Sequence, residues 1–236
     1  NEVGYTSATI YFEFTCEREK PDTSIERPEG SGTVGDPFKI STVGELYWFT
    51  GFTNNYVAVG EDFAVERNKS HAILMNDIIV NPEMLDSYGL IVNSSLLADW
   101  TPICGSANSP YCGTFDGQGY AISGLYYNTP GYQYDAYGFI AYMGEGGAVK
   151  DLTVKDTYFY IKYTSHFTPY VAGIAASSSN ATNTIENCHF DGVAGGDSSN
   201  KGCVAGGITA VTSGKIQNCT VKGRVLGYDS YVGYGK

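Results

Sequence analysis

Two short segments of the sequence share one spacing of apolar and polar residues. The segments "TIENCHF" and "KIQNCTV" each place an Ile, then Asn-Cys, then a further apolar residue at the same intervals. Ile185 and Ile216 lie 31 positions apart, and so do Cys188 and Cys219. A fixed period of this length is typical of repeat proteins, in which each copy buries its apolar face against the next.

A third, less exact copy lies upstream in "AVKDLTV", where Val149 and Leu152 take the places of the Ile and the Cys. Each copy follows a Gly-rich apolar segment, and these segments read "YGFIAYM", "VAGIAAS" and "AGGITAV". The repeating unit therefore contains a Gly-rich strand, a variable loop and a second strand.

The apolar positions within a unit fall at i, i+3 and i+5, whereas an uninterrupted strand would place them at i, i+2 and i+4. A corner between two strands accounts for the extra residue. The corner position holds Asp151, Asn187 or Asn218, and Asp and Asn tolerate the left-handed backbone that a corner needs. The spacing predicts an all-β solenoid whose equivalent residues stack about 4.8 Å apart on successive coils.

Stacked coils align equivalent side chains in ladders. The predicted core ladders contain Val149, Ile185 and Ile216 in one row and Leu152, Cys188 and Cys219 in another. Side chains in register point in parallel, so Cys188 and Cys219 are expected to be stacked free thiols that serve as small apolar core residues.

The segment "STVGELYWFTGF" predicts a short amphipathic helix over residues 43–53. Thr42 and Glu45 have the spacing of a capping box. The apolar residues on one face of this helix are Val43, Leu46, Phe49 and Phe52. Because the first coil of a solenoid exposes its core end-on, the helix is expected to cover that end.

Alternation and turn signals predict three further strand regions. One buried strand is expected from Ala72 to Val80, and two strand segments are expected around the turn from Asp116 to Gly119. The alternating segment over residues 5–15 predicts a half-buried N-terminal strand. The sequence thus divides into an N-terminal strand and linker (1–29), a capping helix with the first coils (30–136), and repeats that are expected to continue beyond the C-terminus (137–236).

The order of these motifs resembles one known family. "GSGTVGDPFKISTVGELYWF" is followed by "LMNDIIV", "WTPIC", "GTFDGQGYAISGLYY" and the repeats. Over roughly residues 30 to 236, this order is similar to the GLUG-motif repeat proteins of bacterial cell surfaces, especially those of gut Firmicutes. The resemblance implies a right-handed parallel β-helix within a secreted, surface-anchored protein associated with adhesion. The strict Gly-Leu-x-Gly form is replaced here by Gly-Ile-Ala-Ala and Gly-Ile-Thr-Ala.

The charge of the chain argues against two classes of partner. There are 14 Lys and Arg residues against 25 Asp and Glu residues, which gives a net charge of -11. Nucleic acid and anionic lipid both attract clustered cations, so neither is an expected partner. No apolar run is long enough to span a membrane.

Cysteine usage favours an exported protein. Cys104 and Cys112 flank the loop "GSANSPY", and a disulfide between them is predicted in an oxidising compartment. Cys16 and Cys203 have no assigned partner. The chain is therefore expected to be extracellular or held at the cell surface.

The residues that catalysis would need are scattered along the sequence. The three His residues show no metal-ligand spacing, and Asp116 in "FDGQG" is read as a turn residue. A carbohydrate-active β-helix needs clustered carboxylates on one outer face, and the candidates are Asp151, Asp156 and Asp191. No catalytic residue, cofactor or metal is predicted, and the chain is not expected to be an enzyme.

Tyrosines are concentrated in the middle of the chain. Six are candidate contacts for a sugar or a protein partner: Tyr126, Tyr127, Tyr132, Tyr134, Tyr158 and Tyr160. Their rings offer flat, rigid contact faces. The alternative, which we favour, is that Tyr simply suits half-buried strands.

The sequence predicts a non-catalytic surface module that serves adhesion or surface architecture, with a glycan or protein ligand on a host or neighbouring cell. One alternative is a filament of identical subunits, joined by strand addition through residues 5–15 or by end-to-end stacking. A second is a carbohydrate-binding or carbohydrate-active β-helix. Ile216, Cys219 and Val221 need a further coil over them, which more repeats of the same polypeptide or an adjacent molecule would supply.

Overall fold

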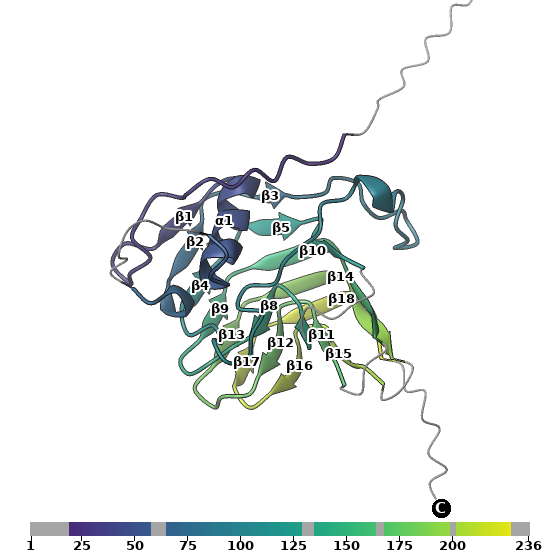
Figure 1. Cartoon of the computed structure of the whole chain (residues 1–236). Helices are drawn as coiled ribbons and strands as arrows, with labels where there is room; N and C mark the ends of the chain where they lie inside the picture. Colours follow the sequence, from purple (N-terminus) through teal and green to yellow (C-terminus); the bar gives the residue numbers. More distant parts are fainter. Residues whose placement is uncertain (1–18, 58–64, 129–134, 164–167, 199–201, 228–236) are drawn as a thin grey trace, which may run out of the picture.

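Parallel pairing between equivalent strands of successive coils builds the structure (Figure 1). The computed structural model describes residues 19–57, 65–128, 135–163, 168–198 and 202–227. These residues form a parallel β-solenoid, as the repeat spacing predicts.

Four sheets run along the solenoid. The first sheet contains, in order, β1 (Phe38–Ile40), β2 (Ala72–Leu74), β4 (Thr114–Asp116), β9 (Ala148–Lys150), β13 (Thr184–Glu186) and β17 (Lys215–Gln217). The second contains β3 (Ile78–Ile79), β5 (Ala121–Ser123), β10 (Thr153–Tyr163), β14 (His189–Ser198) and β18 (Thr220–Leu226), with β6 (Tyr126–Tyr127) also paired to β10. Two smaller sheets contain β7 (Ala136–Tyr137), β11 (Tyr170–Ala172) and β15 (Val204–Gly206), and β8 (Ile140–Tyr142), β12 (Ala175–Ser178) and β16 (Thr209–Thr212).

The first sheet contains the first predicted ladder. Ile185 pairs with Val149 on one side and with Ile216 on the other. The same row continues to Phe115 on the preceding coil. The second ladder has the same order, because the carbonyl of Leu152 accepts from His189 N–H and that of Cys188 accepts from Thr220 N–H. Cys188 and Cys219 are both free thiols.

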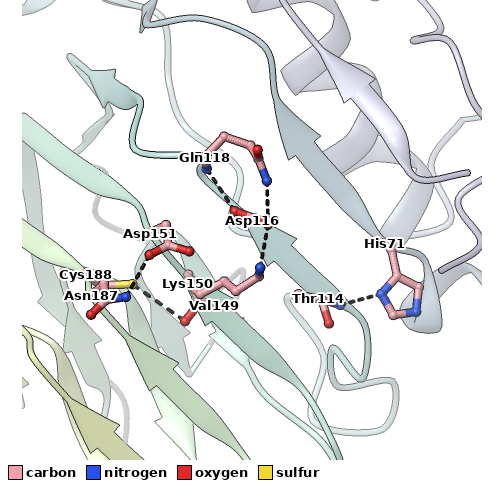
Figure 2. Close-up of polar contacts among 9 residues, drawn as sticks. All are labelled: His71, Thr114, Asp116, Gln118, Val149, Lys150, Asp151, Asn187 and Cys188. Carbon is pink, nitrogen blue, oxygen red and sulfur yellow. Dashed lines mark hydrogen bonds and ion pairs between the residues drawn. The ribbon is translucent and has the colours of Figure 1, made fainter. Parts of the chain in front are cut away.

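The corner residues have the predicted left-handed backbone. Asp151, Asn187 and Asn218 have φ values of 51°, 51° and 48°. Their side chains form a ladder of their own, in which Asn187 Nδ2 donates to Asp151 Oδ1 over 2.8 Å and Asn218 Nδ2 donates to Asn187 Oδ1 over 3.2 Å. Figure 2 shows the first of these bonds beside Val149 and Cys188. Each corner therefore stabilises the next.

Helix α1 (Val43–Thr53) occupies the predicted range and begins with the predicted capping box at Thr42 and Glu45. It packs on the end of the stack that contains β1 and β2, while β17 and β18 lie at the other end (Figure 1). Phe49 contacts Phe38 and Phe115, with ring centroids 6.1 Å and 5.9 Å away. The end of the core is thus covered.

The prediction of a simple amphipathic helix needs a correction, because burial extends beyond one face. Trp48 is also buried and stacks on Phe52 at 4.9 Å. Thr50 and Thr53 are buried too, and their hydroxyls donate to carbonyls three residues back. Residues on more than one face of α1 are buried because the helix lies between the core and neighbouring segments of the chain.

The single strand expected from Ala72 to Val80 is wrong. The structure has two strands, β2 and β3, in different sheets, and exposed residues 75–77 form a corner between them. The two strands predicted around Asp116 to Gly119 are confirmed as β4 and β5. The strand predicted over residues 5–15 lies outside the described residues.

One buried apolar cluster extends from Phe38 to Ile208 along the solenoid. It connects the capping helix and first coils with the repeats. No helix in the described part of the chain is long and apolar enough to cross a membrane.

Candidate functional site

A groove of about 350 Å³ lies on the outer face of the second sheet. One wall is the outer side of β10, β14 and β18, and the other is the projecting loop between β3 and β4. We call residues 82–97 of this loop the arm, which extends beyond β3 and β5 at the upper right of Figure 1. A volume of this size is within the range of small-molecule sites.

The base of the arm is fixed by one buried side chain. Asn81 Nδ2 donates to the carbonyls of Ala98 and Gly124 over 2.9 Å and 2.7 Å, and Asn81 Oδ1 accepts from Ala98 N–H over 2.8 Å. Met84 and Leu97 are buried against Tyr126. The arm is therefore attached to the solenoid at both of its ends.

The tip of the arm is a turn that presents an aromatic ring. Asp86 Oδ1 accepts the N–H groups of Tyr88 and Leu90 over 2.8 Å and 2.9 Å. Tyr88 lines the groove and is 79% exposed. An exposed ring on a hydrogen-bonded turn is a rigid contact face.

The sheet side of the groove depends on an irregularity in strand pairing. Lys155 pairs with Asp191 and Thr157 with Gly192, so Asp156 is one extra residue in β10. Its φ of 48° is left-handed, and its side chain is exposed. Such a bulge redirects a side chain out of the regular alternation, and Asp156 lines the groove.

Two glycines contribute backbone to the same wall. A Cβ on Gly192 would lie 2.4 Å from the carbonyl oxygen of Thr157, and one on Gly223 would lie 2.1 Å from that of Gly192. Only glycine fits between coils that approach so closely. The groove therefore has bare backbone between its charged side chains.

The charges in the groove have different surroundings. Asp191 and Lys222 form an ion pair at 3.0 Å, and this hydrogen bond raises the pKa of Lys222. Within the described residues, the side chains of Asp156 and Arg224 form no hydrogen bond or ion pair, although the charge of Asp156 also raises the pKa of Lys222. Burial raises the pKa of the nearby Tyr158, and the charge of Arg224 opposes that effect.

The six tyrosines predicted as ligand contacts differ in where they lie in the structure. Tyr126 and Tyr127 are buried, which corrects their prediction as ligand contacts. Tyr126 packs under the arm, and Tyr127 stacks on the buried Tyr137 at 4.4 Å. The half-buried pair Tyr158 and Tyr160 lies beside the groove on β10, with ring centroids 6.0 Å apart, while Tyr132 and Tyr134 lie outside the described residues.

The three candidate carboxylates are also divided. Asp156 and Asp191 both line the groove, whereas Asp151 remains at its corner. Asp116 is the last residue of β4, and its carboxylate accepts from Gln118 N–H of the following turn at 2.9 Å and from Lys150 Nζ at 2.7 Å (Figure 2). Among the described residues, no group of three or more His, Cys, Asp or Glu side chains is arranged to bind a metal ion.

The predicted disulfide between Cys104 and Cys112 is not formed, and both are free thiols. The buried Cys104 thiol faces the Thr53 carbonyl of α1, whereas that of Cys112 donates to the carbonyl of Pro110. The two sulfurs are therefore directed at different elements. Burial raises the pKa of Cys104 to about 12, so this thiol stays protonated at neutral pH.

Replacing Asn81 with Ala is expected to release the arm. The change leaves the N–H and carbonyl of Ala98 and the carbonyl of Gly124 without partners, which costs about 1–3 kcal/mol per buried group. Hydrogen exchange of residues 82–97 should accelerate and the melting temperature should fall. The matched change Asn108→Ala, at an exposed position outside the arm, should alter neither, and equal exchange in the two variants would contradict the role of Asn81.

No family model matches the sequence, and no curated protein matches it. The crystal structure of a putative immunoglobulin A1 protease from Bacteroides ovatus is similar, with a TM-score of 0.47 and 18% sequence identity. The match covers 83% of this chain and 60% of that chain.

Proposed function

We propose that the chain is an extracellular, cell-surface β-solenoid module that serves adhesion or surface architecture without catalysing a reaction. The groove under the arm carries this proposal, because it places an exposed aromatic ring and charged side chains on a rigid scaffold. Binding residues are commonly held on loops in this way. The sequence resemblance to GLUG-motif surface proteins also supports it. The partner is a glycan or a protein on a host or neighbouring cell.

Adsorption of the labelled chain to intact cells and to mucin tests this function. We expect saturable adsorption, reduced about tenfold by Tyr88→Ala because an aromatic contact at the centre of a binding site contributes at least that much. Tyr56→Ala, at an exposed position outside the groove, is the matched control. Equal adsorption of the two variants would remove the groove from the function, and no saturable adsorption of the wild type would contradict adhesion.

A filament of identical subunits is the second candidate, and the last described coil favours it. All four sheets end on this coil, at β15, β16, β17 and β18. Ile216 and Val221 are 40% and 46% exposed there. Residues 202–227 contain Lys215, Lys222 and Arg224 but no acidic residue. A basic, apolar end is attracted to the acidic surface of another copy, so association that weakens with added salt is the expected result in light scattering.

A further inference from the structure

We propose that the groove binds a neutral oligosaccharide, with Asp156 and Arg224 as its polar contacts and the Tyr88 ring as its stacking face. This inference deepens the proposed adhesive function and rests on it. The groove is the place where the described residues combine bare backbone, unpaired charged groups and an exposed ring.

The hydrogen-bonding groups of the groove call for a ligand that both donates and accepts. The carboxylate of Asp156 only accepts hydrogen bonds, and the guanidinium of Arg224 only donates them. Both groups line the groove, and among the described residues neither side chain has a hydrogen-bond or ion-pair partner. Each hydroxyl of a sugar is a donor and an acceptor, so one polyhydroxylated ligand satisfies both side chains.

The balance of charge favours a neutral ligand over an ionic one. Three carboxylates line the groove, those of Asp86, Asp156 and Asp191, together with the cations Lys222 and Arg224. An anion is attracted by Arg224 but repelled by the carboxylates. A cation is attracted by the carboxylates but repelled by Arg224. The ion pair of Asp191 with Lys222 leaves little net charge on that side.

The separation of the two contacts sets the length of the ligand. Asp156 lies on β10 and Arg224 on β18, with β14 between them. Two strand spacings give a backbone separation of about 10 Å. A ligand that reaches both side chains is therefore longer than one sugar ring, which agrees with a groove of about 350 Å³.

The floor and the arm complete the site. Gly192 and Gly223 let a ligand approach the backbone closely, because neither carries a side chain. Tyr88 is held at the tip of the arm by the turn that Asp86 organises. Its ring supplies an apolar face for the C–H groups of a sugar, while its hydroxyl meets water.

The test is calorimetric titration of the whole chain with neutral oligosaccharides, namely glucans, mannans, xylans and N-acetylglucosamine oligomers, and with oligogalacturonate as the acidic probe. We expect at least one neutral oligosaccharide to bind more tightly than the acidic probe. Arg224→Ala and Asp156→Gly should each weaken binding about tenfold. Gly suits the left-handed backbone of position 156, so the fold is retained. Asn55→Gly, at an exposed residue with φ of 63° outside the groove, is the matched control.

The possible outcomes distinguish failure of the oligosaccharide inference from failure of the proposed adhesive function. Tighter binding of the acidic probe, or neutral binding that none of the groove variants weakens, would overturn the inference. Cell adsorption that depends on Tyr88 without binding of any oligosaccharide would also overturn it, while the adhesive function would stand. Oligosaccharide binding without cell adsorption would support the site and contradict adhesion.

Discussion

Replacing Ile185 with Asp is expected to abolish the cooperative unfolding transition of the solenoid. Ile185 is only 1% exposed and lies between Val149 and Ile216 in the core ladder. A carboxylate at this position has no described cation beside it within the ladder and loses its water, so the loss of stability exceeds about 4 kcal/mol. Thermal unfolding followed by circular dichroism measures the effect.

The same ladder provides the matched control. Ile216 occupies the equivalent position one coil further along and is 40% exposed. An Asp there keeps contact with water, so Ile216→Asp should cost about 1 kcal/mol or less. An unchanged melting temperature for Ile185→Asp would contradict the burial of the ladder. A large loss for Ile216→Asp would show that the open end is covered in solution.

Parts of the fold could be predicted where one local structural requirement selects the residue type at a given position. Asn187 and Asn218 marked corners because few residues accept a left-handed backbone. Ile185 and Ile216 marked a ladder because the period returned the same side chain to the same row. The helix was found because a capping box needs only Thr42 and Glu45 three residues apart.

Predictions failed where the sequence pattern does not show at which residue the chain turns or which way a side chain points. Apolar residues lie on both sides of the corner at 75–77, so two strands in different sheets looked like one. The short loop between Cys104 and Cys112 suggested a disulfide, but loop length does not show where each thiol points. Neither segment belongs to the repeats, so no repeat register was available to correct either interpretation.

The groove could not be predicted as a unit, because its residues come from four separate segments. Asp156 and Asp191 were named as candidates, but their approach depends on the bulge in β10 and on the register with β14. Tyr88 was missed entirely. Its one signal is an aromatic residue within the polar turn "DSYG", where no strand needs a ring.

Replacing Phe49 with Ala is expected to destabilise the chain by about 3–5 kcal/mol, which is typical of a buried Phe. Phe49 is fully buried and contacts Phe38, Tyr111 and Phe115, so the cavity would open at the covered end of the core. An end that is no longer covered exposes apolar surface and strand edges. We therefore expect a lower melting temperature in circular dichroism and larger particles in light scattering.

The exposed Tyr88→Ala is the matched aromatic control and should leave both measurements unchanged. The effect of salt on light scattering distinguishes association through the last coil from association through the end that α1 covers. The association proposed for the wild type through the last coil depends on Lys215, Lys222 and Arg224 and should weaken with salt. Association caused by Phe49→Ala is apolar, so salt should not weaken it. A monomeric Phe49→Ala variant with an unchanged melting temperature would contradict the assignment of α1 as the cap.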